Sequence, residues 1–518
     1  MIEIIGIAGL TFLLRALPGI LRIQPGGGDQ TYHLLVADEI RARKFKYPGE
    51  LRGFLMPGLY IYPVFFPYLL SLLPKFARER LAPFYSAIID TIHVILIYFF
   101  ALYVLQQTEL SSLVLNPSLV ATIAALLFAT SPALLYIGVG PRAYAATPRI
   151  LGELFITLTL FSTAIYYWEG IWWAALLSCL FAGLTLITSR FSAQVLLFFS
   201  VILAPLLRFP LLLALPILGV ICAFMLSKGH YQRVLRGHVK HLIRYHRFQY
   251  QFPVIRRNSL SAFKDVLTRA KSRKFRQSAN NFLGILNNNT FIILVTRNVM
   301  LLLLVYFIIL NFSLITSNNT FVFLCSWIAA SFIVFIITSL KPLLFLGEAE
   351  RYIEHSVPAQ AILLSFFLIS LKDIAPLMAY HFLFYAGTLA FLCVSHRMGL
   401  KDRETKQGLF DWFRLQNIHG KKILAFLSGL SFEIAYGTAN EVLFPAGDRW
   451  LNPKEYEILF EEYPYPNINL KMLIERYGLE LIIVNKKVLE NARKRGWIYD
   501  LSPYAKVFEN DFYTVYET

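Results

Sequence analysis

The chain has 518 residues, of which 57% are apolar, 15% aromatic and only 16% charged. A water-exposed surface usually needs about 25% charged residues, so the composition excludes an ordinary soluble enzyme, a coiled coil and a disordered protein. The formal net charge of +17 indicates an anionic partner, and for so apolar a chain anionic lipid or a phosphate-bearing substrate ranks before nucleic acid.

Apolar stretches recur through the first 395 residues, and their length predicts transmembrane helices, since backbone groups in lipid must be hydrogen-bonded within their own segment. Another stretch, 59–74, contains three prolines, which favours a broken or surface-lying helix. The predicted fold class is an all-α polytopic membrane protein of about 11–13 transmembrane helices with a small C-terminal α/β domain outside the membrane. The eleven predicted spans are 2–21, 83–106, 118–138, 150–167, 171–189, 192–207, 210–227, 290–312, 320–340, 356–371 and 374–394.

The N-terminal span is expected to be retained, because Glu3 stands where a cleaved signal peptide has basic residues. It leads into a first external loop, 22–58, within the predicted membrane domain 1–395. Apolar residues at 34, 35, 36 and 40 predict a helix lying at the membrane interface in this loop.

A basic loop, 228–289, carries 14 Lys and Arg and one Asp between positions 228 and 279. The positive-inside rule favours the cytoplasm, but six predicted spans separate this loop from the first loop, which places both on one side of the membrane. We favour the span count, because the positive-inside bias weakens in long loops. The loop is then expected to lie along anionic headgroups or an anionic acceptor.

The chain ends in a basic amphipathic linker, 396–422, and a small α/β domain, 423–518. Within this domain the sequence predicts a strand at 481–485, a helix at 486–495 and a closing pair of strands at 505–508 and 512–516.

Asp29 is the first candidate for chemistry, because it follows the first span in a Gly-rich turn at the water boundary, with His33 one helical turn further on. The competing interpretation is a helix N-cap, and one carboxylate can fill both roles. Asp38 and Glu39 are expected on a solvated face.

Charged residues also gather before two later spans. Glu350, Arg351 and Tyr352 stand in a segment rich in carboxylates, where Arg351 could hold a phosphate or balance an interfacial ion cluster. Arg142 and Arg149 flank a short loop and could bind phosphate or simply extend to the interface.

These elements resemble the GT-C superfamily of integral-membrane glycosyltransferases, which includes protein mannosyltransferases and the aminoarabinose transferase of lipid A. The resemblance rests on a first span containing Arg15, on the acidic turn ending at Asp29, on Tyr60-Ile-Tyr-Pro63, and on Arg351-Tyr352 before Pro358. It implies an inverting enzyme that takes a sugar from a polyprenyl-phosphate donor, with Asp29 as general base or acceptor-positioning residue. The substrate-binding residues would be His33, Arg142, Arg149, Glu350, Arg351 and Tyr352.

The resemblance also implies a lipid, glycan or protein acceptor, contact with membrane lipids but not nucleic acid, and a bacterial inner membrane with the active site on its outer face. No metal ligand is assigned and a divalent metal stays open, because the 139–149 loop lacks Asp. Trp172-Trp173 lacks the acidic residue of the oligosaccharyltransferase motif, which argues against that activity. The rival functions are a transporter or flippase of lipid-linked sugars and a polysaccharide polymerase. Few charges lie within the spans, Arg297 and Asp90 being the clearest, which favours the enzyme.

Overall fold

The fold is taken from a computed structural model of the chain. The structure describes residues 2–20, 27–56, 58–107, 116–135, 145–248, 290–369, 375–398, 400–426, 430–444, 450–451, 469–494 and 496–518. Its contacts divide the chain into two compact units. The helical unit comprises Met1–Arg22, Pro83–Gln232 and Lys240–Cys393, and the loop–sheet unit comprises Ile23–Ala82, Arg233–Val239 and Val394–Thr518.

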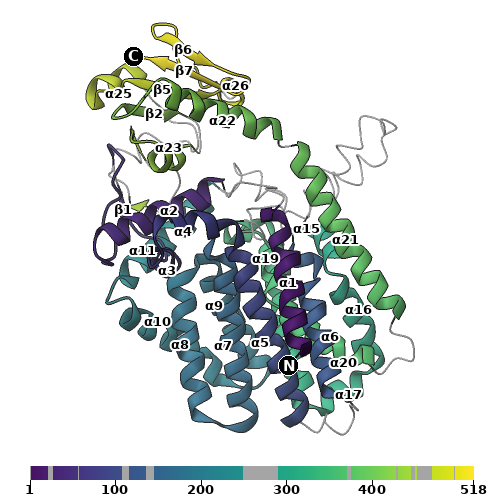
Figure 1. The fold of residues 1–518 in the computed structure, drawn as a ribbon. Coiled ribbons are helices and arrows are strands. Elements are labelled where there is room, and N and C mark those ends of the chain that lie inside the picture. Colours follow the sequence, from purple (N-terminus) through teal and green to yellow (C-terminus); the bar gives the residue numbers. More distant parts are fainter. Residues whose placement is uncertain are drawn as a thin grey trace. The chain divides into compact units, whose positions relative to one another are not determined.

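The helical unit is a bundle of apolar helices that run side by side (Figure 1). Its longer helices are α1 (Ile2–Ile20), α5 (Tyr85–Gln107), α6 (Pro117–Ala129), α7 (Pro148–Glu169), α8 (Trp172–Thr188), α9 (Arg190–Leu206), α10 (Leu215–Leu226), α16 (Val299–Leu310), α18 (Asn319–Ser339), α20 (Val357–Ile369) and α21 (Ala375–Met398). Shorter turns join them: η1 (Ala82–Phe84), η3 (Pro132–Leu134), η4 (Pro210–Leu213), α15 (Thr290–Arg297), α17 (Phe312–Ser317), η5 (Lys341–Leu346) and α19 (Glu350–Glu354). The basic helix α11 (Tyr231–Phe248) contributes residues to both units.

Glycines let neighbouring helices of this bundle approach closely. A side chain at Gly183 of α8 would meet Cβ of Cys222 in α10 at 2.6 Å, and one at Gly152 of α7 would meet Cβ of Ser189 at 2.7 Å. Apolar helices in lipid associate mainly through such close packing, because lipid tails are as apolar as the side chains.

Three helical stretches in the described part of the chain are long and apolar enough to cross a membrane, namely Lys75–Gln106, Pro148–Glu169 and Asn319–Ser339. The pair Thr290–Arg297 and Val299–Leu310 passes the same criterion together but is bent by 73°, and five shorter helices are also apolar. Every one of the eleven predicted spans contains a helix, so the predicted fold class is confirmed and the chain is an integral membrane protein. Stretch 59–74 holds only the short helix α3 (Phe65–Ser71), as its prolines predict.

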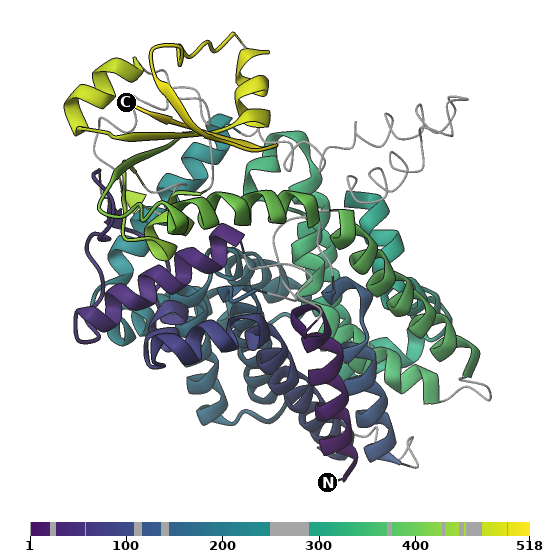
Figure 2. The same cartoon turned by 45° about the horizontal axis from the view of Figure 1, so that its top comes forward.

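The loop–sheet unit is built on a five-stranded mixed sheet of order β3-β2-β5-β7-β6 (Figure 2). Strand β2 (Lys422–Phe426) is parallel to β3 (Glu441–Val442) and β5 (Leu481–Asn485), whereas β7 (Tyr513–Glu517) is antiparallel to β5 and β6 (Ala505–Glu509). The helices of this unit are α2 (Gly27–Ala42), α3, α4 (Lys75–Leu81), α22 (Leu400–Leu415), α23 (Ser431–Gly437), α25 (Leu470–Tyr477) and α26 (Lys486–Arg493). The predicted strand 481–485, the following helix and the closing strand pair are therefore present.

The first loop is part of this unit rather than of the membrane bundle to which the sequence assigned it. Residues 53–56 run beside β3, with the Leu55 amide donating to the Val442 carbonyl at 2.9 Å and the Met56 amide to the Leu443 carbonyl at 2.7 Å. Strand β1 (Leu59–Tyr60) pairs antiparallel with β4 (Trp450–Leu451). The unit boundary differs from the predicted one because the loop completes the sheet.

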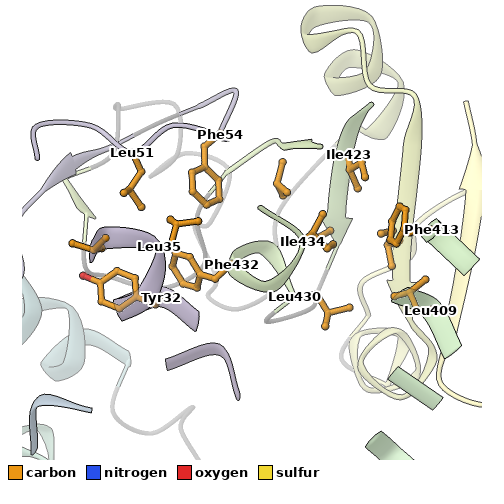
Figure 3. Close-up of a cluster of buried hydrophobic side chains, with 14 of the residues drawn as sticks. Tyr32, Leu35, Leu51, Phe54, Leu409, Phe413, Ile423, Leu430, Phe432 and Ile434 are labelled. Atoms are coloured by element: carbon orange, nitrogen blue, oxygen red, sulfur yellow. The ribbon is translucent and has the colours of Figure 1, made fainter. Parts of the chain in front are cut away.

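The apolar face of α2 is buried in the same core. Leu35, Val36 and Ile40 are at most 8% exposed and belong to one cluster with Phe413, Ile423 and Phe432 from the C-terminal part of the chain (Figure 3). The sequence predicted a helix at these positions, but its apolar residues pack on protein instead of lying in the membrane interface.

Helix α11 comes close to the stretch 59–74, where a Cβ on Gly237 would collide with the Ile61 carbonyl oxygen. Glycine is therefore needed at this close approach.

Candidate functional site

A cluster of ionisable side chains lies buried where α7 begins and α19 ends, within the helical unit. Arg149, the second residue of α7, donates from Nη2 to Glu354 Oε1 at 2.6 Å and Oε2 at 2.8 Å. Its Nε lies 3.5 Å from Glu153 Oε1, one turn along the helix. The side chain of Arg149 is 8% exposed, that of Glu354 is 2% exposed and that of Glu153 is 4% exposed. One arginine thus balances two buried carboxylates, and we call these residues, with Glu350 and Arg351, the charged cluster.

Glu350 is a third buried carboxylate of the charged cluster, with 3% of its surface exposed. Thr290, the first residue of α15, donates its hydroxyl to Glu350 Oε2 at 3.2 Å. Buried charges are costly unless they are hydrogen-bonded or serve a function, so three carboxylates in one place mark this end of the bundle as a functional candidate.

Arg351 is the most accessible member of the charged cluster, with 22% of its side chain exposed. Its Nη1 donates to Glu348 Oε2 at 2.9 Å, and its guanidinium lies 4.7 Å from the centre of the Phe191 ring. An ion pair at one edge and an aromatic ring on one face fix the plane of the guanidinium, which suits bidentate recognition of a phosphate.

Tyr352 is fully buried beside Arg351. Its hydroxyl lies 3.1 Å from both Gln194 Oε1 and the Leu346 carbonyl, and its ring centre lies 4.6 Å from that of Phe191. Burial raises the pKa of this phenol, the Glu348 carboxylate adds to the rise, and Arg351 opposes it. Tyr352 therefore stays a neutral donor that anchors the segment before α20.

In the loop–sheet unit, Asp29 and His33 lie one turn apart on α2. Asp29 is partly exposed and stands in the first turn of the helix, not at the cap position before it. In the first turn its negative charge interacts favourably with the helix dipole. His33 is only 1% exposed, and its ring lies against Tyr32, Tyr62 and Phe66 with centre distances of 4.8, 5.9 and 5.4 Å. The surroundings of His33 are those of a core side chain.

The acidic residues further along α2 do not form the solvated face that the sequence predicted. Glu39 is 6% exposed and pairs with Arg43 and Arg52, and Asp38 pairs with Arg78, whose side chain is fully buried. The prediction was wrong because α4 packs on α2 and brings Arg78 to Asp38, while Arg43 and Arg52 from the segment after α2 pair with Glu39.

Two of the predicted features lie outside the described residues, namely Arg142 and most of the basic loop, 249–289. Within the ranges that the structure describes, no group of three or more His, Cys, Asp or Glu side chains could hold a metal ion.

The structure adds polar groups that the sequence did not single out as a site. Arg15 of α1 and Asp90 of α5 form an ion pair of 3.1 Å, with side chains 0% and 1% exposed. Nearby in the bundle, His381 Nε2 lies 3.0 Å from Thr130 Oγ1. The sequence offered one signal for the ion pair between Arg15 and Asp90, because each of the two apolar spans contains a charged residue. Nothing in the sequence indicated that Phe191 and Gln194 of α9 would contact the Arg351 segment.

The buried pair gives a stability prediction. Glu354→Ala leaves Arg149 buried without its main partner, and we expect the unfolding free energy to fall by about 3–5 kcal/mol. A melting curve in detergent measures this. Glu490→Ala is the matched control, because its ion pair with Lys494 is exposed, and it should not change the melting temperature. Equal melting temperatures for the two variants would contradict a stabilising role for the pair.

No protein-family model and no curated protein sequence matches this chain. Solved structures do match. ArnT from Cupriavidus metallidurans bound to undecaprenyl phosphate is similar with a TM-score of 0.57 and 8% identity over 100% of this chain and 97% of its own. The archaeal oligosaccharyltransferase AglB from Archaeoglobus fulgidus, in complex with an inhibitory peptide and a dolichol-phosphate, has a TM-score of 0.53 and 11% identity over 93% of this chain and 69% of its own.

The apo state of the same ArnT has a TM-score of 0.54 at 10% identity, again over 100% of this chain and 97% of its own. The chain therefore shares the fold of ArnT and AglB, which confirms, at the level of fold alone, the resemblance predicted from the sequence. The match to ArnT covers nearly the whole of both chains, C-terminal domain included.

Proposed function

We propose that this chain is a membrane glycosyltransferase that takes a sugar from a polyprenyl-phosphate donor and transfers it to a lipid, glycan or protein acceptor. The observation that carries the proposal is the shared fold with two proteins solved with polyprenyl phosphates, undecaprenyl phosphate in ArnT and dolichol-phosphate in AglB. A buried cluster of carboxylates and arginines at one end of the bundle supports it. The proposed location is a bacterial inner membrane, with the active site on the outer face.

In the proposed reaction, Arg351 neutralises the phosphate that leaves with the lipid. Its contacts with Glu348 and Phe191 fix the guanidinium, so that no reorganisation is needed when charge develops on the departing oxygen. Arg149 is already held by Glu354 and Glu153, and its proposed role is to keep this end of α7 and α19 together. Glu350 and Tyr352 hold the segment on either side of Arg351.

Asp29 is proposed as the base that activates the acceptor. The acceptor hydroxyl gives its proton to the carboxylate, its oxygen forms a bond to the anomeric carbon, and the bond from that carbon to the phosphate oxygen breaks with its electrons on the phosphate. A single displacement of this kind inverts the anomeric centre. An ionised carboxylate can accept the proton that the acceptor hydroxyl gives up.

The proposal is tested with the purified chain in lipid nanodiscs, supplied with a panel of polyprenyl-phosphate sugars and a membrane extract as acceptor. We expect free polyprenyl phosphate to appear in step with sugar on an acceptor. A transporter or flippase would move the donor across vesicle bilayers without releasing polyprenyl phosphate, and that result would replace the proposed function. Products of increasing length would identify a polysaccharide polymerase.

A further inference from the structure

Helix α21 carries hydrogen-bonding side chains on the face that it buries in the protein. His381, Tyr385 and Thr388 are 1%, 5% and 6% exposed, and their spacing of four and three residues places them on one face of the helix. The opposite side is apolar, with Leu383 70% exposed. Because α21 lies in one of the eleven predicted spans, the apolar side meets acyl chains. A polar inner face on such a helix indicates polar partners or a ligand inside the membrane.

His381 has its partner in the protein. The Thr130 hydroxyl gives its proton to the Leu126 carbonyl at 2.6 Å, so it accepts from His381 Nε2 at 3.0 Å. Thr130 directly follows α6. This hydrogen bond therefore attaches α21 to the end of α6.

The hydroxyl of Tyr385 is satisfied in a different way. It is buried and makes no hydrogen bond to any residue within the described ranges. The Tyr385 ring packs against Leu14 of α1 and against Leu135, and its phenol interacts electrostatically with both Arg15 and Asp90. A hydroxyl buried without a hydrogen bond destabilises a protein, so a polar group from outside the described chain is expected beside it.

The ion pair between Arg15 and Asp90 limits what that group can be. The pair is neutral as a whole, so it favours neither a cation nor an anion, and a carboxylate can accept several hydrogen bonds at once. A small neutral molecule that both donates and accepts matches a hydroxyl, a guanidinium and a carboxylate together. Each member of the pair stands five residues from the end of its helix, about 7.5 Å along the axis, which is close enough to the end of the bundle for water to enter.

We propose that Tyr385, Arg15 and Asp90 form an internal hydration site, in which ordered water bridges the Tyr385 hydroxyl to the ion pair and so holds α21 against α1 and α5. All three residues belong to the helical unit. Buried water of this kind requires two to four polar partners, which these side chains supply. The inference does not depend on the proposed enzyme activity.

The presence of water is tested by X-ray radiolytic labelling of the full chain in lipid nanodiscs. A short pulse converts water bound beside a side chain into hydroxyl radicals, which oxidise that side chain in place. The control is Leu383→Tyr, which puts the same side chain on the lipid-facing side of α21 two residues away. In this variant we expect Tyr385 to be oxidised at least about fivefold faster than position 383. Equal rates at the two positions would overturn the hydration site.

The part played by the ion pair is tested in the same assay. Arg15→Met combined with Asp90→Leu removes both charges, and a buried pair replaced by apolar residues usually leaves a protein folded. Oxidation of Tyr385 should then fall to the rate at position 383, with a melting curve confirming that the variant is folded. Unchanged oxidation in the folded variant would show that the pair does not hold the water.

Tyr385→Phe tests the bridge by its effect on stability. Deleting a hydroxyl that has no partner should leave the melting temperature unchanged or raise it, whereas deleting one that bonds to water held by the ion pair should lower it. We expect a fall of at least about 3 °C. The control is Tyr306→Phe on α16, where the side chain is 60% exposed and the melting temperature should not change. An unchanged or raised melting temperature for Tyr385→Phe would overturn the bridge.

Discussion

Asp29→Asn is expected to lower sugar transfer by at least ~100-fold, because a general base of this kind contributes about 10²–10⁴ to the rate and an amide cannot accept the proton. The fold should survive, since an acidic residue in the first turn of a helix contributes only about 0.3–1 kcal/mol through the helix dipole. The measurement is release of polyprenyl phosphate from a lipid-linked donor, with a melting curve on the same sample.

The control for this prediction is on the same helix. Asp38→Asn removes the charge that pairs with the buried Arg78, so it should lower the melting temperature while leaving transfer by the folded protein near normal. Asp29→Asn is therefore expected to lower transfer but not the melting temperature, and Asp38→Asn to lower the melting temperature but not transfer. Near-normal transfer by the Asp29 variant would reduce Asp29 to a helix-stabilising residue.

The sequence was most informative where a local pattern decides the structure. Spans such as Asn319–Ser339 are helical because an apolar segment in lipid has no other way to satisfy its backbone. The strand Leu481–Asn485 is equally local: four of its five residues are buried, and turn residues bound it. These elements appear at or within a few residues of their predicted positions.

The sequence was least informative where distant segments meet. The first loop joins the C-terminal sheet through Val442, almost 400 residues later, and no local pattern marks such a pairing. For the same reason Asp38 looked solvated, since its partner Arg78 stands 40 residues later in the chain. The apolar residues of α2 predicted a helix at the membrane interface, because the pattern could not say whether lipid or protein covers the apolar face.

The candidate site shows the same division. The Arg351 segment was identified from its density of charge beside a span, which is a local signal. The bond from Arg149 to Glu354 joins residues 205 positions apart, and it supports the proposal that Arg149 holds two helices together. Arg351 is more exposed than Arg149 and is the arginine that we propose to bind a phosphate.

Arg351→Lys is expected to lower the rate of transfer at least ~10-fold, which corresponds to about 1.4 kcal/mol of transition-state stabilisation. Lysine keeps the positive charge but lacks the planar fork that makes two parallel bonds to a phosphate, and it cannot lie flat on Phe191. The melting temperature should change little, because the charge remains beside Glu348 and a cation over an aromatic ring contributes about 0.5–1 kcal/mol at a partly exposed site. Transfer from a purified lipid-linked donor and a melting curve measure the two effects.

Arg414→Lys is the matched control, because Arg414 also pairs with an acidic residue three positions earlier, Asp411, but on the exposed helix α22. It should leave transfer and melting unchanged, since exposed ion pairs contribute about 0–1 kcal/mol and lysine preserves the charge. If Arg351 only balances Glu348, the two lysine variants will behave alike. A selective loss of transfer at position 351, in a protein that melts normally, instead requires a role for the guanidinium geometry itself. Full activity of Arg351→Lys, or a loss that follows a loss of folding, would remove Arg351 from the proposed mechanism.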